Sequence, residues 1–155
     1  MFLYKGSEIS QELFSSWACL MILQCLAFAW FTGRSRVRHE VIHSEEDKMW
    51  LKNPKTKITS NFCCHPEVRH LRSGHLRNLE MIMPYLLMTP IWLSTSPSRL
   101  VAKIILHSFP IFAITDSLLY MNLVETPKVL GNFTFVVCYS LIVYVTVSNL
   151  ISSCW

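Results

Sequence analysis

Four long apolar runs divide this chain and limit what it can fold into. A helix needs about twenty residues, at about 1.5 Å each, to cross about 30 Å of hydrocarbon. All four runs approach or reach that length, the second if its helix starts near His75. Their apolar residues are continuous rather than alternating, which indicates helices and not the strands of a barrel. The runs are Leu13–Phe31, Leu79–Leu93, Leu100–Val124 and Phe133–Ile151.

The composition places these runs in a membrane. The chain has 155 residues, of which 52% are hydrophobic and 15% charged. A soluble domain of this length would have too little polar surface to cover so much apolar side chain. We therefore predict one domain over residues 1–155, an all-α integral membrane four-helix bundle. Its helices are expected at about 11–33, 66–93, 99–124 and 129–152.

The distribution of lysine and arginine along the chain predicts its orientation in the membrane. Nine of the fourteen lie between the first apolar run and His75, whereas the residues after the last run have none. The positive-inside rule then places this loop in the cytosol and both chain ends on the other side. The net charge of +4 is thus a topology signal, and no nucleic-acid partner is expected. The nine are Arg34, Arg36, Arg38, Lys48, Lys52, Lys55, Lys57, Arg69 and Arg72.

The six cysteines predict neither a disulfide framework nor a metal site. Four of them lie in or beside apolar runs, where a thiol behaves as a small hydrophobe. Cys63 and Cys64 are in the loop predicted to be cytosolic, which is a reducing compartment. They precede His65 directly, but adjacent cysteines lack the usual spacing of zinc ligands. No metal site is therefore expected.

Charged residues at the start of the second membrane helix are the first candidate site. The stretch Val68–Pro84 reads VRHLRSGHLRNLEMIMP and carries Arg77 and Glu80. A charge inside a membrane is costly, so it marks a functional site with a partner to be found. Arg77 and Glu80 are three apart and can pair on one helix face. The alternative is that this pair is structural and joins helices.

Other polar residues are expected to gather nearby. Asp116 and Tyr120 are four apart on the third predicted helix and share a face. Three arginines crowd into residues 34–38 at the end of the first helix. In a bundle these groups would meet near the cytosolic membrane boundary, where arginines and carboxylates suit a zwitterionic ligand. Alternatively, residues 34–38 only anchor the helix end, and Tyr120 only belongs to an interfacial aromatic belt.

These residues resemble a known family. Val68, His75, Glu80, Ile82 and Pro84 are similar to the second-helix signature of the membrane-associated eicosanoid and glutathione metabolism (MAPEG) superfamily. The nearest resemblance is to microsomal glutathione transferase and microsomal prostaglandin E synthase. Further matches keep register over residues 28–130: Thr32-Gly33 followed by Arg36 and Arg38, Glu46-Asp47, and Tyr120 with Pro127.

The resemblance implies a homotrimer of four-helix protomers in the endoplasmic reticulum membrane or the mitochondrial outer membrane. Glutathione would be the co-substrate, bound between protomers on the cytosolic side, and its thiolate would attack a lipophilic electrophile or a lipid hydroperoxide. Asp47 and Tyr120 are the implied catalytic residues. The implied glutathione contacts are Arg36, Arg38, His75, Arg77, Glu80 and Tyr120.

The sequence also departs from the family pattern. His70, Ser73, Ala113 and Val129 stand where arginine is usual, Arg77 replaces asparagine, and Asp116 replaces histidine. A lost cation at a developing charge can cost about 3–4 kcal/mol of barrier. A second hypothesis is therefore a catalytically impaired relative that acts as a membrane scaffold or ligand-binding protein. Arg77 and Arg69 could restore some of the lost positive charge, whereas Lys128, the neighbour of Val129, is turned by about 100° around the helix.

Overall fold

The computed structural model describes residues 2–39, 65–121 and 128–154, with side chains from Ser10 onward and, in the last segment, from Val129. These segments are helical, and they contain no strand. The helices are α1 (Phe2–Arg38), α2 (Pro66–Ser94), α3 (Arg99–Tyr120) and α4 (Lys128–Cys154). The predicted all-α fold with four helices is thus confirmed. α1 is longer than expected, because it begins at Phe2 and continues through the arginines of residues 34–38.

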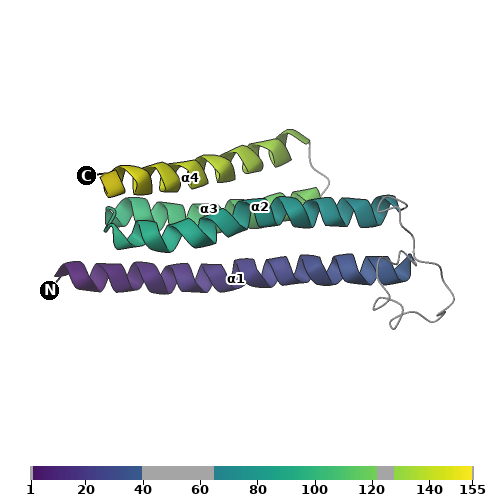
Figure 1. Cartoon of the computed structure of the whole chain (residues 1–155), viewed down its shortest axis with the longest axis horizontal. Helices are drawn as coiled ribbons and strands as arrows, with labels where there is room; N and C mark the ends of the chain where they lie inside the picture. Colours follow the sequence, from purple (N-terminus) through teal and green to yellow (C-terminus); the bar gives the residue numbers. More distant parts are fainter. Residues whose placement is uncertain (1, 40–64, 122–127, 155) are drawn as a thin grey trace.

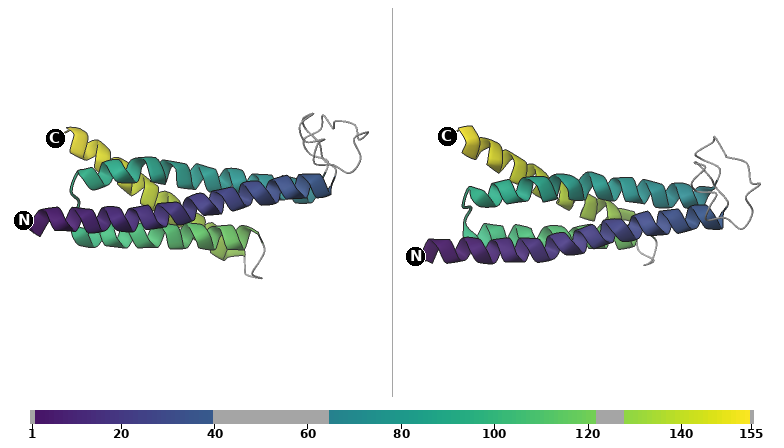
Figure 2. Two further views of the ribbon diagram at one scale, coloured as in Figure 1. Left: turned by 90° about the horizontal axis from the view of Figure 1, so that it is seen from below. Right: turned by 60° about the horizontal axis from the view of Figure 1, so that its bottom comes forward.

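The four helices lie along one another in a single elongated bundle (Figure 1). α1 packs against α2 and α3, while α4 packs on the other side of those two. α4 slants across the bundle axis, as Figure 2 shows. Both chain ends and the turn between α2 and α3 lie at one end (Figure 1). We call the opposite end, where α1 ends and α2 begins, the basic end.

The sequence explains the short turn between α2 and α3. α2 ends at Ser94, and Pro97 cannot continue a helix without losing a backbone donor. The N–H groups of Thr95 and Ser96 donate to the carbonyls of Trp92 and Leu93, at 3.1 and 3.2 Å. Ser96 has a φ of 56°, the one positive φ among the described non-glycine residues. Two antiparallel helices therefore follow each other closely.

Three of the four helices are long and apolar enough to cross a membrane: α1 from Ser10, α3, and α4 from Val129. α2 does not meet that measure, contrary to the sequence-based expectation of four such helices. The difference arises because charged residues lower its hydropathy, among them Arg69, Arg72, Arg77 and Glu80. α2 nevertheless runs beside the other helices over most of its length (Figure 1).

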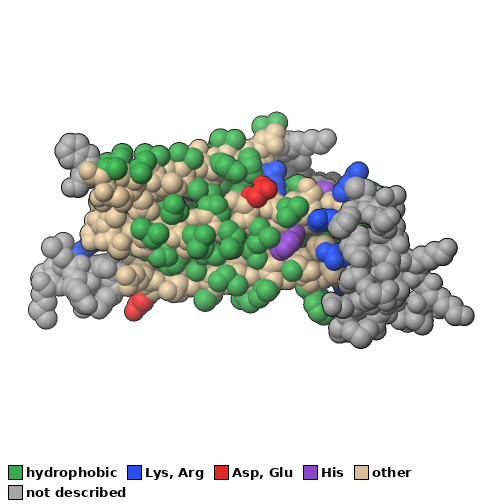
Figure 3. Space-filling view, in the orientation of Figure 1, with side chains coloured by type: hydrophobic (Ala, Val, Ile, Leu, Met, Phe, Trp, Pro, Cys, Tyr) green, Lys and Arg blue, Asp and Glu red, His purple; other side chains and the backbone are tan. Residues whose placement is uncertain are grey.

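The outer surface of the bundle is apolar. Hydrophobic side chains cover much of the described surface in view, while lysines and arginines gather near the basic end (Figure 3). Leu23 and Trp30 of α1 are 61% and 69% exposed, and leucines and valines of α4 are similarly uncovered. Soluble monomers rarely expose apolar patches this extensive. Three spanning helices with such a surface indicate a multi-pass membrane protein.

Aromatic residues fill the part of the bundle remote from the basic end. Tyr85, Trp92 and Phe109, which we call the aromatic core, are almost completely buried. The rings of Tyr85 and Phe109 stack with centroids 3.8 Å apart. The indole N–H of Trp92 donates to Ser148 Oγ at 3.1 Å, which joins α2 to α4. This core is continuous with buried Met21 and Leu106.

Candidate functional site

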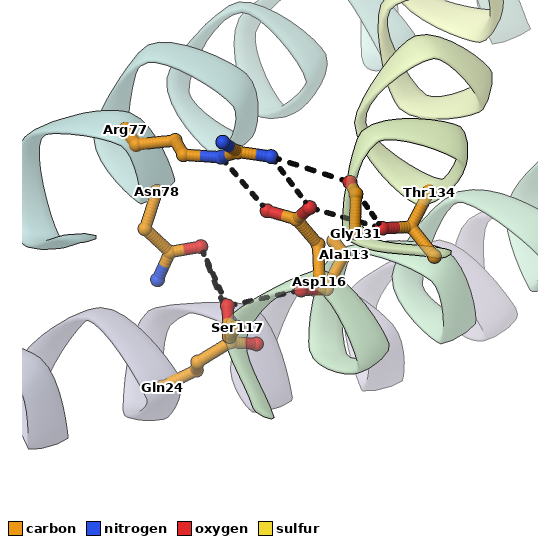
Figure 4. Close-up of polar contacts among 8 residues, drawn as sticks. All are labelled: Gln24, Arg77, Asn78, Ala113, Asp116, Ser117, Gly131 and Thr134. Atoms are coloured by element: carbon orange, nitrogen blue, oxygen red, sulfur yellow. Dashed lines mark hydrogen bonds and ion pairs between the residues drawn. The ribbon is translucent and has the colours of Figure 1, made fainter. Parts of the chain in front are cut away.

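A bidentate ion pair joins α2 to α3 inside the bundle. Arg77 Nε donates to Asp116 Oδ2 at 3.1 Å, and Arg77 Nη2 donates to Asp116 Oδ1 at 2.8 Å (Figure 4). The Asp116 side chain is only 3% exposed, while that of Arg77 is 28% exposed. A carboxylate this enclosed is tolerable because it is paired and hydrogen-bonded. The expected pairing of Arg77 with Glu80 is therefore wrong: the charge that Arg77 contacts is Asp116, on another helix.

α4 completes this ion pair. Thr134 Oγ1 is 3.0 Å from Asp116 Oδ1 and 2.9 Å from the Gly131 carbonyl, so its single proton can go to either acceptor. Arg77 Nη2 also lies 3.5 Å from that carbonyl. The Arg77 guanidinium carbon lies 4.2 Å from the ring centroid of Phe135, which provides a cation–π contact. Three helices thus converge on one charge pair.

A neutral hydrogen-bond network lies beside the ion pair and brings in α1. Gln24 Nε2 donates to Asn78 Oδ1 at 3.2 Å and to Ser117 Oγ. Ser117 Oγ lies 3.2 Å from Asn78 Oδ1 and 3.0 Å from the Ala113 carbonyl (Figure 4). Asn78 directly follows Arg77 in the chain, and Ser117 directly follows Asp116, so the two networks form one continuous layer. The polar layer comprises Gln24, Arg77, Asn78, Asp116, Ser117 and Thr134.

The polar layer lies toward the basic end. Asp116 is four residues before the end of α3, or about 6 Å along the helix. Closer still to that end, the His70 and Tyr120 rings stack with centroids 4.7 Å apart. His70 Nε2 donates to the Tyr120 carbonyl at 3.0 Å and so satisfies one of the free carbonyls at the end of α3. The Arg77 guanidinium is 5.6 Å from the Tyr120 centroid.

Gly74 allows Tyr120 to approach α2. A Cβ added at Gly74 would stand 2.8 Å from two ring atoms of Tyr120 and 3.4 Å from Phe28. No ordinary side chain fits at that distance. Because position 74 has no side chain, the Tyr120 ring can lie directly against α2, beside Arg77.

A cavity of about 320 Å³ opens at the basic end between α1 and α2. Two arginines and one carboxylate contribute to its wall, which gives it a cationic character. The hydrogen bond from His39, with help from nearby Arg38, holds the pKa of Glu67 below its usual range. The cavity is lined by Phe31, Arg34, Ser35, Arg38, Glu67, Leu71 and Met121.

The structure places the predicted site residues in three groups. Arg77 and Tyr120 lie together with Asp116, and Arg38 lines the cavity at the basic end. Arg36 and His75 are half-buried, and Glu80 is exposed on α2. His75 Nδ1 is enclosed and has no hydrogen-bond partner in the described part of the chain. Asp47 lies outside the described residues, as does the side chain of Lys128.

Sequence reasoning missed Gln24, Asn78, Ser117 and Thr134 as partners in one network. Gln24 interrupts the first apolar run, Thr134 lies within the fourth, and Asn78 and Ser117 directly follow Arg77 and Asp116. All four lie in predicted membrane helices, and that was the available signal, because an unpaired polar group in hydrocarbon is costly and requires a partner. Arg34 was also absent from the predicted binding set, although it lines the same cavity as Arg38.

No protein-family model matches this chain, and no curated protein sequence matches it. The function therefore has to be argued from the site itself.

Proposed function

We propose that this protein is a membrane-bound glutathione transferase or peroxidase of the MAPEG type. It would act as a homotrimer in the endoplasmic reticulum membrane or the mitochondrial outer membrane, with the basic end in the cytosol. Its substrates would be glutathione and a lipophilic electrophile or lipid hydroperoxide that reaches the site from the bilayer.

The arginine-lined cavity at the basic end is the observation that carries this proposal. Its volume of about 320 Å³ is near the lower end of small-molecule sites and suits a tripeptide. Arg34 and Arg38 supply two guanidinium groups, and guanidinium binds carboxylates bidentately. Glutathione carries two carboxylates. The α2 residues that resemble the family signature begin with Val68, one turn of α2 before Leu71 of the cavity wall.

The basic end also suits the chemistry. A thiol is a weak nucleophile until it loses its proton, and a nearby cation promotes that loss by lowering the thiol pKa. The thiolate sulfur would then attack the electrophilic carbon, forming a C–S bond while the leaving group departs with its electron pair. Glu80 is exposed on the single chain, which suits a residue that meets glutathione at a contact with a second copy.

The Arg77–Asp116 pair favours a second candidate function. Two nitrogens of Arg77 are bonded to Asp116, so its charge is compensated and less able to stabilise a thiolate. The family's usual arginine is also absent at Ala113, which is fully buried beside this pair. On this reading the protein binds glutathione or a lipid at the basic end without turnover.

Calorimetric titration of the full-length, detergent-solubilised protein with glutathione tests the proposal. Binding should be saturable, and Arg38→Ala should weaken it by at least about tenfold, since one charge-assisted hydrogen bond contributes about 1.5–3 kcal/mol. Lys103→Ala is the matched control, because Lys103 is an exposed cation near the opposite end of α3. Absence of binding, or equal losses in both variants, would reject the proposal.

Turnover separates the two candidates. An enzyme should conjugate glutathione to a lipophilic aryl halide, and Glu80→Gln or Tyr120→Phe should reduce the rate. Saturable binding without conjugation or hydroperoxide reduction would instead support the ligand-binding relative.

A further inference from the structure

A cluster of metal-ligating side chains lies where α1 ends and α2 begins. His39, His65 and Glu67 each offer one ligand atom, and these atoms lie within 4.8 Å of one another. His39 follows directly on α1, with its N–H donating to the Ser35 carbonyl at 3.0 Å. His65 is the N-cap residue of α2 and Glu67 is in its first turn. Residues 26 positions apart in the chain are thus brought together by the packing of two helices.

The three side chains already face one another. His39 Nε2 and Glu67 Oε2 are 2.8 Å apart. The rings of His39 and His65 stack with centroids 3.5 Å apart and planes 19° from parallel. For comparison, ligands about 2.0–2.1 Å from a tetrahedral zinc ion lie about 3.3 Å from each other. Because the ligand atoms lie within 4.8 Å of one another, side-chain rotations that unstack the two rings would be the change needed to place them around one ion.

One ring nitrogen of His65 has no partner in the described structure. His65 Nδ1 is shielded from solvent, yet it has no hydrogen-bond partner among the described residues. His65 makes no side-chain capping bond to α2 either. A shielded ring nitrogen without a partner is costly, and a bound cation would satisfy it. Glu67, whose side chain is 50% exposed, keeps one side of the cluster open for a fourth ligand from solvent.

We propose that His39, His65 and Glu67 form a binding site for a zinc-class divalent transition-metal ion. Two imidazoles and one carboxylate are a ligand set that zinc uses when a fourth position stays open. Imidazole ligands disfavour magnesium and calcium, which prefer oxygen ligands. The bound ion would clamp α1 to α2 at the point where both extend beyond α3 and α4 (Figure 1).

This site was not expected from the sequence. The nearest zinc pattern in the sequence is Cys63-Cys64-His65, but its spacing is wrong for zinc, and Cys63 and Cys64 lie outside the described residues. His39 and His65 are far apart in the chain, so no motif based on residue spacing predicts that they form a site. The site shares Glu67 with the wall of the proposed glutathione cavity, but zinc binding is a separate property and can be tested without glutathione.

Zinc titration of the full-length protein in detergent, without an affinity tag, tests the site. A chromophoric chelator as competitor reports the affinity. The wild-type protein should bind one zinc ion, and His39→Gln, His65→Gln and Glu67→Gln should each weaken binding by more than about tenfold. Even outer-shell partners of a metal change its affinity by about 10–100-fold, so the loss of a ligand should exceed the low end of that range.

Two controls make the result specific. His107→Gln removes a histidine of α3 whose Nδ1 bonds to the Lys103 carbonyl, and it should bind zinc like the wild type. A Cys63→Ser/Cys64→Ser variant should also keep the wild-type affinity. The proposal is overturned if the wild-type protein does not bind zinc more tightly than the His39→Gln variant does. It is equally overturned if the cysteine variant loses zinc while His39→Gln retains it.

Discussion

The aromatic core and the polar layer connect the same helices of the bundle, but through different interactions. In the aromatic core, Tyr85 and Phe109 stack, and close packing is the main contact between the helices. In the polar layer, an ion pair and a hydrogen-bond network contact all four helices. Helices in lipid gain little from hydrophobic burial against each other, so packing and polar contacts must join them.

This difference indicates which of the two regions should tolerate substitutions better. Packing contacts are many and individually weak, so a core can lose one with a graded cost. A buried charge, by contrast, depends on one partner, and its loss leaves the other charge uncompensated. The polar layer is therefore expected to be the more fragile of the two regions, although it contains fewer large side chains.

The largest effect is expected at Asp116. Asp116→Leu removes the carboxylate and leaves Arg77 with only the Gly131 carbonyl and aromatic faces as described partners. Breaking a buried pair costs about 3–5 kcal/mol, and the 28% exposure of Arg77 places the expected loss near the lower end, at about 3 kcal/mol. Unfolding in detergent by titrated denaturant, followed by helicity, measures it.

A double variant shows whether the loss comes from the uncompensated charge. Arg77→Met combined with Asp116→Leu should recover most of the lost free energy of unfolding, because well-packed apolar residues can replace a buried ion pair. Thr115→Val is the control, since within the described residues the Thr115 hydroxyl bonds only to the Ile111 carbonyl of its own helix. If the double variant is as unstable as Asp116→Leu, the polar layer is not fragile for the reason given.

A smaller loss is expected in the aromatic core. Phe109→Ala removes a fully buried ring that stacks on Tyr85. Such changes cost about 3–5 kcal/mol in water-soluble proteins. Here we expect about 2–3 kcal/mol, because lipid replaces water as the reference environment. Ile111→Ala, at a 50% exposed position on the same helix, should change unfolding much less. A loss larger than that of Asp116→Leu would reverse the proposed ranking.

The sequence predicted the elements of this fold better than their contacts. The expected helices at 66–93 and 129–152 nearly coincide with α2 and α4, because Pro66 suits a first helical position and Pro127 precedes a new helix. The partner of Arg77 was not predictable in the same way. Glu80 lies within reach along α2, but Asp116 offers a bidentate contact that depends on which face of α3 meets α2. A single sequence does not encode that rotation in any local pattern.

Gly74 tests the connection between the polar layer and Tyr120. Gly74→Ala should displace the Tyr120 ring, because the new Cβ would stand 2.8 Å from it. Overpacking of this kind costs about 1–3 kcal/mol, and a ring at the edge of the layer can move, so about 1–2 kcal/mol is expected. Gly33→Ala is the matched control, since nothing lies within 4 Å of its added Cβ. Equal effects in the two variants would show that helix propensity, not the contact with Tyr120, determines the change.

The smallest effect is expected where α1 joins the polar layer. Gln24→Leu removes the donor to Asn78 and Ser117 but preserves side-chain volume. The Asn78 carbonyl oxygen still lies 3.2 Å from Ser117 Oγ, so no charge and little polar surface is left without a partner. Hydrogen bonds between membrane helices average about 0.6 kcal/mol, and a loss of that size is expected.

A further feature of the network keeps that loss small. Gln24 Oε1 is itself buried without a partner among the described residues, so its removal offsets part of the cost. Ser140→Ala provides the baseline, because in the part of the chain that the structure describes the Ser140 hydroxyl bonds only to the Val136 carbonyl of its own helix. If Gln24→Leu instead destabilises the protein as much as Asp116→Leu does, the neutral network and the ion pair form one cooperative unit. The fragility of the polar layer would then result from the hydrogen bonds that connect all four helices, and the charge pair would be only one part of the cause.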